Sequence, residues 1–402
     1  MVHIPSERVV QREMNGIVAR LWYVSASGDK NTAILVKAPT LSIKAMISGC
    51  KVTLEFGKNT IDDKTYLCIG VRIFDIPDAP VFISYVQREV EEHQALVEVL
   101  RLRQSPIFLF NEMNLCVAWS DAEISGTDST RVMVLMGDPH NLYMGDSTPS
   151  VALCLDCFCI SIDDTAKYEG AYPIETVSIS PVFSGWNSVK HVFYGFREIN
   201  KFSIQEEDEG KALEKEIWFS LESVFPLTLH KNPEVMIGTK KRELTDIFSY
   251  QDSRSFLIET KALALLETGT DIPQEKRVKR VHAHARKAIG QLVGAVKAFI
   301  RNDPIYTMKG KRLDVDRSKP PHCIVLVTEL IHSSDWSEIA EQLRKATEKT
   351  GAFFHLLDYR ELLTLLKQSG TSDRLHHHLV GRWKLFIQTR NVHIRSESVT
   401  AA

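Results

Sequence analysis

The sequence predicts a two-part protein of mixed α/β or α+β class, in which a β-rich N-terminal half precedes a half where helices and strands alternate. Short apolar runs bounded by Gly, Asp, Asn or Pro fill the first half, as strands separated by turns do. Beyond residue 211 the apolar patterns follow the order α-β-β-β-α-β-α-β-α, which indicates helices packed on a mixed sheet. The two halves also differ in charge.

The charge difference separates the halves near the acidic run at 205–210. From Lys231 onward the chain has 29 Lys and Arg against 20 Asp and Glu, a net charge of +9, whereas the remainder has 20 against 31, a net charge of −11. A basic part beside an acidic part is expected when only one of them meets a polyanion. We therefore predict one domain of residues 1–205 and a second of residues 206–402.

The composition is that of an ordinary globular protein. Of the 402 residues, 44% are hydrophobic and 25% are charged. The sequence contains no long apolar run and no signal-peptide core at its start, so we expect a cytoplasmic protein without a membrane span. The odd number of cysteines, 7, favours reduced thiols.

The N-terminal half shows strand patterns, one helix at 88–103 and no catalytic constellation. Cys154, Cys157 and Cys159 lie in one apolar run, and no second pair of ligands follows them. Buried strand cysteines are therefore favoured over a zinc site. We expect this half to be a sensing, binding, oligomerisation or scaffold module. The expected strands are 33–38, 51–56, 65–74, 80–86, 105–113, 114–120, 131–137, 151–162 and 191–196.

The C-terminal half is expected to begin with an amphipathic helix at 211–225, because Leu213, Ile217, Leu221 and Val224 form one apolar stripe. A strand at 233–238 and a β-hairpin follow. Then come a helix that begins with the basic segment 276–287 and runs to 300, and an alternating series of strands and helices. The series is 322–329 (strand), 335–349 (helix), 353–358 (strand) and 359–367 (helix).

The hairpin at 244–261 brings three charged residues to one face. If its turn is centred between Asp252 and Ser253, Asp246 lies directly opposite Glu259. Lys261 follows two residues later, so strand alternation returns it to the same face. Two carboxylates and an ammonium group are therefore expected to converge.

Two opposed carboxylates suit a hard divalent cation. Mg²⁺, or Mn²⁺ in its place, uses one or two carboxylates, keeps several waters and leaves positions for phosphate oxygens. The main-chain carbonyl of Thr260 could supply a further oxygen, and Lys261 could position the attacking water or stabilise developing negative charge. Such a site fits phosphodiester hydrolysis.

These residues resemble the signature of the PD-(D/E)xK nuclease superfamily, whose fold is that of restriction endonucleases. Asp246 opens the motif, and Glu259-Thr260-Lys261 after the apolar run 256–258 matches its E-x-K element. Thr245 stands where the motif's name has Pro. The resemblance spans about residues 211–365, and 211–328 show the αβββαβ order of the family's core. It implies a metal-dependent nuclease.

The family pattern also implies two further site residues. Gln291, on the helix after E-x-K, occupies the place of a glutamine that often helps to hold the active site. A glutamate of the first helix often adds a metal contact. Glu216 and Glu222 are both candidates for that contact, and we take Glu216 as the metal-site candidate while the choice stays open.

The basic segment is the candidate DNA-binding surface, and a charged, solvated helix face is its alternative interpretation. Its position after the candidate site favours phosphate contacts, and the basic run at 309–312 is a weaker candidate. The predicted contacts are Lys276, Arg277, Lys279, Arg280, Arg286 and Lys287.

The sequence thus predicts a Mg²⁺-dependent endodeoxyribonuclease acting on DNA, with the acidic half as a sensor, a scaffold, or a module for a homo-oligomer or partner protein. The charge split suggests that the acidic half shields the basic half until a trigger binds. A bacterial defence effector would have such an arrangement, by analogy of fold alone. One alternative is a non-catalytic nucleic-acid-binding scaffold with a degenerate nuclease fold. Another is a surface hairpin with a charge pair.

Overall fold

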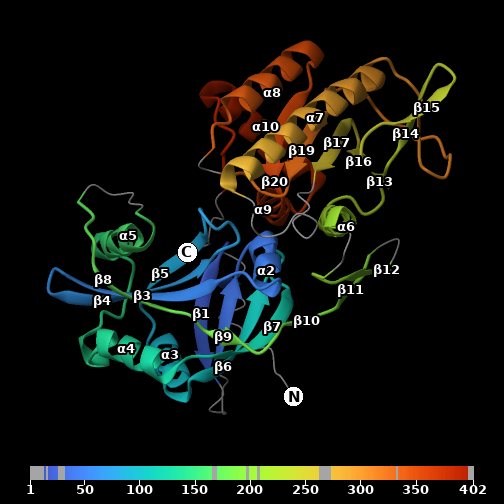
Figure 1. Ribbon diagram of the computed structural model, residues 1–402. Coiled ribbons are helices and arrows are strands. Elements are labelled where there is room, and N and C mark those ends of the chain that lie inside the picture. Colours follow the sequence, from blue (N-terminus) through green and yellow to red (C-terminus); the bar gives the residue numbers. More distant parts are fainter. Residues whose placement is uncertain are drawn as a thin grey trace. The chain divides into compact units, whose positions relative to one another are not determined.

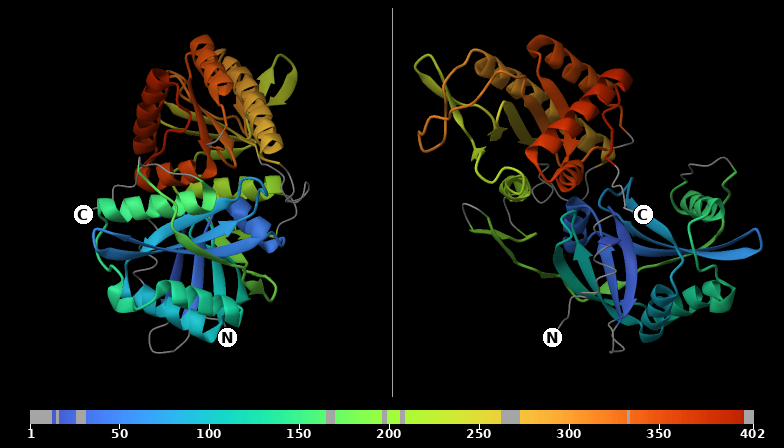
Figure 2. Two further views of the ribbon diagram at one scale, coloured as in Figure 1. Left: turned by 60° about the vertical axis from the view of Figure 1, so that its left-hand side comes forward. Right: turned by 180° about the vertical axis from the view of Figure 1, so that it is seen from behind.

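The computed structural model describes residues 13–14, 17–25, 32–164, 170–195, 199–205, 209–261, 273–331 and 334–396. The chain forms two compact units. The first runs to Lys190 and includes Ser203–Gln205; the second comprises His191–Phe202 and the described residues 209–261 and 274–396. Figures 1 and 2 show both units. The segment 191–202, placed by the sequence in the first domain, thus groups with the second unit.

The first unit contains two sheets, and mixed α/β structure with several sheets is confirmed. In the larger sheet the order is β1-β2-β6-β7-β10 with β9 also beside β7; its strands are Arg20–Ser25 (β1), Thr32–Lys37 (β2), Gln104–Phe110 (β6), Cys116–Glu123 (β7), Val182–Phe183 (β9) and Asn187–Ser188 (β10). The smaller sheet is antiparallel in the order β5-β4-β3-β8, with Val52–Ile61 (β3), Lys64–Ile73 (β4), Val81–Gln87 (β5) and Glu175–Ile179 (β8).

Two runs predicted as strands in this unit are helices. Residues 131–137 fall mostly in α4 (Gly126–Met136), and 151–162 fall in α5 (Pro149–Asp163). Thr148 caps α5 and Pro149 occupies its first turn. Its buried residues Val151, Cys154 and Phe158 recur at three and four positions, the helical spacing, so the apolar run belongs to a helix. The other helices are α2 (Thr40–Ile47), α3 (Val90–Leu102) and the short 3₁₀ helix Pro139–Asn141.

The second unit is built on a mixed sheet in the order β13-β16-β17-β19-β20. β13 pairs antiparallel with β16 and β16 antiparallel with β17, whereas β17, β19 and β20 are parallel. The strands are Leu229–Lys231 (β13), Ile247–Gln251 (β16), Arg254–Lys261 (β17), His322–Val327 (β19) and Phe353–Asp358 (β20).

Helices cover both faces of this sheet. They are α6 (Glu209–Glu222), α7 (Gln274–Ile300), α8 (Ser337–Thr350), α9 (Tyr359–Ser369) and α10 (Ser372–Thr389). Leu257 of β17 belongs to the apolar core formed with α7 and α8. Phe256, its neighbour, points to the other face, where its ring lies 5.0 Å from that of Phe225. Alternation along β17 therefore assigns each side chain to one of two differently built faces.

The run 233–238, predicted as the first of the three strands before α7, does not join the main sheet. It forms β14 (Glu234–Ile237), in a separate sheet ordered β15-β14-β18 with Lys240–Glu243 (β15) and Ile305–Tyr306 (β18). The first strand of the main sheet is instead the less apolar β13. With β13 in that place, the order α6, β13, β16, β17, α7, β19 is the expected αβββαβ order. A β-hairpin of His191–Tyr194 (β11) and Ile199–Phe202 (β12) adds to this unit, with Phe193 stacked 4.7 Å from Phe219 of α6.

In the part of the chain that the structure describes, no helix has the length and hydrophobicity needed to cross a bilayer.

Candidate active site

The hairpin of β16 and β17 has the predicted register. Ile247 pairs with Ile258, Phe248 with Leu257 and Gln251 with Arg254, which centres the turn between Asp252 and Ser253. Asp252 adopts a left-handed conformation with φ of 51°, which an aspartate in a turn tolerates. The register prediction is therefore confirmed over the paired residues 247–258.

Asp246 lies just before β16, and its carboxylate is fixed by β17. Its Oδ2 accepts hydrogen bonds from the Thr260 backbone N–H at 2.6 Å and from the Thr260 hydroxyl at 3.1 Å. The Asp246 carbonyl accepts from the backbone N–H of Asn232 at 2.8 Å. Side-chain bonds thus continue the hairpin beyond the end of its backbone ladder, and they orient the carboxylate. The sequence did not indicate this contact.

Thr245 contributes to the same extension. Its hydroxyl donates to the carbonyl of Ile258 at 2.8 Å, and the residue is buried. A proline at this position would have no side-chain donor. The departure of Thr245 from the motif's proline is therefore compatible with a tightly joined hairpin.

Glu259 is buried, with 2% of the residue exposed. Alternation places it on the face of Leu257, which is the face that α7 covers. Its parallel partner is Val325 of β19. The backbone of Lys261 lies in β17, opposite Val327, and its side chain is outside the described residues.

The Thr260 carbonyl points to the side of β17 on which Asp246 lies. In a strand, the N–H and C=O of one residue point to the same side. Because the Thr260 N–H donates to Asp246, its carbonyl points to that side as well. This geometry is compatible with the predicted contribution of Thr260.

The two first-helix glutamates are both buried on α6, at 4% for Glu216 and 5% for Glu222. Residues six apart on a helix point in different directions, so at most one of them can face a given site. In the part of the chain that the structure describes, the Glu222 Oε1 has no hydrogen-bond partner. The predicted role of Glu216 stays a prediction.

Gln291 lies on α7, the helix that covers the Glu259 face, and its side chain is exposed. The helix turns Leu292 into the core, and Gln291 lies beside that buried stripe. The predicted support of the active site by Gln291 stays a prediction.

Three of the six basic residues in the segment 276–287 of α7 pair with carboxylates. Arg277 is 3% exposed, and its Nε lies 2.5 Å from Glu329 Oε1 in an ion pair without hydrogen-bond geometry. Lys279 pairs with Glu275 at 2.5 Å and Arg286 with Glu338 at 3.0 Å. Arg277 is therefore not a DNA contact, because it is buried in the helical phase of Val281 and Ala285.

Three further exposed residues of this segment lie on one stripe of the helix. Lys276, Arg280 and Lys287 follow each other at intervals of four and seven positions, so they share a face. Their predicted contact with DNA stays a prediction.

The donor set at the hairpin fits a magnesium ion in its chemistry. Among the described residues, no group of three or more His, Cys, Asp or Glu side chains is arranged to hold a metal. Two carboxylates and a carbonyl oxygen are a smaller set, of the kind that Mg²⁺ completes with water and phosphate oxygens. The hydrogen bonds to Asp246 orient one of these ligands in advance.

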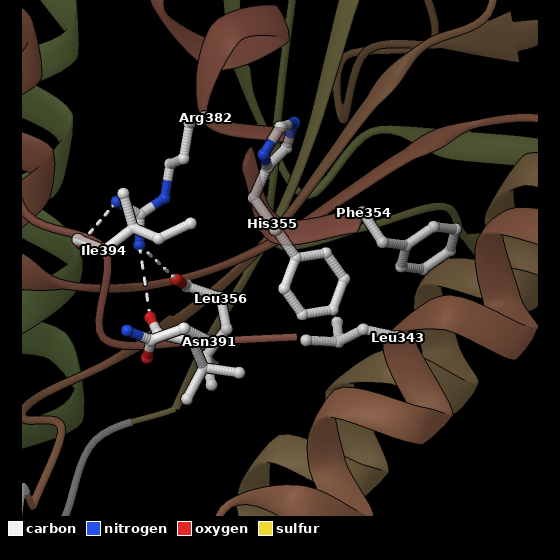
Figure 3. A pocket seen from close by; sticks show the side chains of 9 residues that line it. Leu343, Phe354, His355, Leu356, Arg382, Asn391 and Ile394 are labelled. Carbon is white, nitrogen blue, oxygen red and sulfur yellow. Dashed lines mark hydrogen bonds between the residues drawn. The ribbon is translucent and has the colours of Figure 1, made fainter. Parts of the chain in front are cut away.

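A pocket elsewhere in the second unit has a structural explanation. It is lined by Leu343, Phe354, His355, Leu356, Arg382, Phe386, Asn391, Val392 and Ile394. Figure 3 shows the Arg382 guanidinium directed at backbone oxygens. It donates to the carbonyls of Ile394 at 2.5 Å and Leu356 at 3.2 Å, and to Glu361 at 3.1 Å. These bonds fasten the C-terminal segment to β20, and no residue of the hairpin lines the pocket.

Comparison with known proteins leaves the family of the chain open. No protein-family model matches it, and no curated protein does. Among solved structures, it is similar to the small subunit of the heterodimeric restriction endonuclease R.BspD6I, at 12% identity over 46% of this chain and 89% of that chain. The TM-score of 0.26 is too low for this similarity to support an argument about fold or function.

Proposed function

We propose that the second unit is a metal-dependent nuclease that hydrolyses phosphodiester bonds in DNA. The observation that carries this proposal is the fixed carboxylate of Asp246, bound to the middle residue of Glu259-Thr260-Lys261 in a hairpin of the expected register. The restriction-endonuclease-like assignment of the fold is part of the proposal, and the order of α6, β13, β16, β17, α7 and β19 supports it.

Asp246, Glu259 and the Thr260 carbonyl would hold Mg²⁺ or Mn²⁺, with Glu216 as a further candidate. The bound metal supplies Lewis acidity and lowers the pKa of a coordinated water. The chain's own part is to hold its oxygens in place, because ligands fixed before substrate binds need no reorganisation during the reaction. Lys261 would neutralise charge on the phosphate as it develops.

Burial of Glu259 is a further support. A carboxylate that is removed from water is costly unless cations or hydrogen-bond donors surround it. A metal ion and an ammonium group provide those conditions, whereas a surface charge pair needs no burial. The hairpin therefore fits a binding site better than an exposed charge pair.

The isosteric change Asp246→Asn tests the proposal. It keeps the shape of the side chain and removes its negative charge, so we expect cleavage of plasmid and linear DNA with Mg²⁺ to fall at least roughly 10²-fold, the loss typical of removing one preorganised catalytic group. Single-turnover rates measure the effect.

Asp252→Asn is the matched control in the same hairpin. Its side chain is 77% exposed, and asparagine tolerates the left-handed conformation of this position. We expect this variant to cleave like the native protein. Equal cleavage by native protein and Asp246→Asn would contradict the proposal. DNA binding with no cleavage by the native protein would support the scaffold alternative.

The first unit remains the predicted sensing, partner-binding or oligomerisation module. Cleavage by residues 191–402 alone, which include the β11–β12 segment of the second unit, compared with the full chain, tests whether the first unit shields the second.

A further inference from the structure

A second basic surface lies on the small sheet β15-β14-β18. Two turns form its ends: the turn between β14 and β15, with Gly238 at φ of 62°, and the turn at 307–311, with Gly310 at φ of 76°. Gly suits both turns because it adopts positive φ without steric cost. Figure 1 shows the β14–β15 hairpin extending from the second unit, and the orange segment after α7 lies beside it in Figure 2.

Both turns carry exposed cations. After the first turn they are Lys240, Lys241 and Arg242, and around the second they are Lys309, Lys311 and Arg312. The two groups belong to one sheet because β14 pairs with β15 on one side and with β18 on the other. Tyr306 of β18 then bridges to Arg312. We call this set of six residues the basic platform.

The platform's cations are mostly without local carboxylate partners. Lys241 pairs with Glu234 at 3.1 Å, and both side chains are partly exposed, so the pair is weak. For the other five, no ion pair is seen in the part of the chain that the structure describes. On α7, by contrast, Arg277, Lys279 and Arg286 are each paired. Unneutralised charge favours the platform as the stronger anion-binding surface.

The chain connects the platform directly to the candidate active site. Only Glu243, Leu244 and Thr245 separate Arg242 from Asp246. A chain of four steps spans at most about 14 Å. At about 3.4 Å per nucleotide of a duplex strand, this span covers about four nucleotides. Leu244 and Val235 anchor the sheet in the core of the unit, so its position relative to Asp246 is set.

We propose that the basic platform binds the phosphate backbone of duplex DNA, with Arg242 within about four nucleotides of the phosphate placed at Asp246. This inference rests on the proposed function and names the surface that positions its substrate. The partner follows from charge complementarity, because the six cations are exposed. The carboxylates Glu234 and Glu243 pair at the end of the hairpin that is away from the β14–β15 turn, where Glu234 also lies opposite Tyr306. Phosphate contacts of this kind position DNA without reading its sequence.

The test measures DNA binding without cleavage. We would place Lys240→Gln, Lys241→Gln and Arg242→Gln together in a Glu259→Gln background, in EDTA, and follow fluorescence anisotropy of a labelled 30-base-pair duplex at several salt concentrations. We expect Kd to rise at least tenfold near 100 mM salt. We also expect the slope of log K against log salt to become shallower by about 3, since each lost phosphate contact removes about 0.9. The same change at Lys309, Lys311 and Arg312 should give a similar loss.

Two controls separate position from net charge. Lys345→Gln, Lys349→Gln and Arg390→Gln together remove the same charge from exposed positions on α8 and after α10, and should leave Kd within twofold. Lys240→Arg with Lys241→Arg keeps the charge and should bind as the background does.

Unchanged Kd and slope in the platform variants would overturn the inference. An equal loss in the α8 control would do so too, as would tighter binding of polyglutamate than of the duplex. Because binding is read in EDTA, an inactive native protein would refute the proposed function while leaving this result interpretable.

Discussion

The two faces of the second unit's central sheet bury polar groups in opposite ways. On the face under α7, β17 presents the carboxylate of Glu259 beside apolar Leu257. On the other face, His322 hydrogen-bonds to His355 at 3.0 Å and to His376 at 2.8 Å. Both arrangements occur on one sheet, with Glu259 on β17 and the histidines on β19, β20 and α10, so the sheet itself does not decide what a buried polar group is for.

The histidine face completes its own hydrogen bonding. A neutral imidazole donates at one nitrogen and accepts at the other, and His322 uses both nitrogens on other imidazoles. Its ring also stacks on Phe256 and Phe353. The carboxylate face instead buries a group whose charge is costly to remove from water unless cations or hydrogen-bond donors surround it. The histidine face therefore serves stability, whereas on the carboxylate face we propose that the buried charge serves a metal ion.

The largest effect is expected from Glu259→Gln. This change removes the buried charge, so that both faces of the sheet would bury only uncharged polar groups. Cleavage should fall by roughly 10³-fold or more, because losing a metal ligand removes several kcal/mol of transition-state stabilisation and each 1.4 kcal/mol is tenfold. Mg²⁺ should raise the unfolding midpoint of the native protein and not that of the variant, since only a ligand bound to the folded state stabilises it. Thermal unfolding with and without Mg²⁺ measures this.

Glu348→Gln on α8 is the matched control, because that carboxylate is 59% exposed. It should retain cleavage and the Mg²⁺-dependent shift. If Mg²⁺ shifts native protein and Glu259→Gln equally, the carboxylate face holds no metal and the contrast between the faces fails.

The histidine face should make the second unit sensitive to acid. Burial, together with nearby His376, lowers the pKa of His322 to about 3. Burial also lowers the pKa values of His355 and His376, with His322 and Arg382 acting on the former and Arg254 on the latter. A lowered folded-state pKa means that the unfolded chain binds protons first. The stabilisation is therefore complete above about pH 6.5 and is lost as the pH falls from there toward 3.

The slope should approach about 1.4 kcal/mol per pH unit for each of the two buried histidines, His322 and His355. Hydrogen exchange of β19 and β20 peptides between pH 5 and pH 7, corrected for intrinsic exchange, gives the opening free energy. In His322→Phe with His355→Phe the slope should be smaller than in the native protein. Equal slopes would show that other groups cause the acid sensitivity.

Local patterns in the sequence were enough to predict the hairpin but not its surroundings. Turn residues and alternation gave the register of β16 and β17, because both depend on neighbouring residues. The contact of Asp246 with Thr260 depends on where the backbone ladder ends, and no local pattern reports that. The chain of His322, His355 and His376 joins two strands and a helix that are distant in the sequence.

Two predictions were wrong although the sequence spacing indicated the correct answer. Arg277 precedes Val281 and Ala285 at intervals of four, so its place on the apolar stripe of α7 indicated burial. Val151, Cys154 and Phe158 likewise had helical spacing within an otherwise uniform apolar run. No local pattern indicated that β13, and not β14, joins the main sheet. The more apolar strand, β14, lies outside that sheet, because tertiary packing determines which strand pairs with β16.

Substitution of Thr260 gives the smallest expected effect and tests whether the two faces are independent. Alternation assigns the Thr260 side chain to the histidine face, yet its hydroxyl donates to Asp246 at 3.1 Å. Thr260→Val keeps the shape and removes that donor, and the backbone N–H at 2.6 Å remains. A hydrogen bond to a charged group is worth about 1.5–3 kcal/mol. With the second bond retained, we expect single-turnover cleavage to slow by about tenfold, which is about 1.4 kcal/mol.

Thr260→Ser keeps the hydroxyl and should cleave at nearly the native rate, which separates loss of the donor from loss of packing. A Thr260→Val protein that cleaves as fast as the native one would show that the backbone N–H alone orients Asp246. In that case the register of the hairpin would fix the position of the Asp246 carboxylate, and no side chain from the histidine face would be needed.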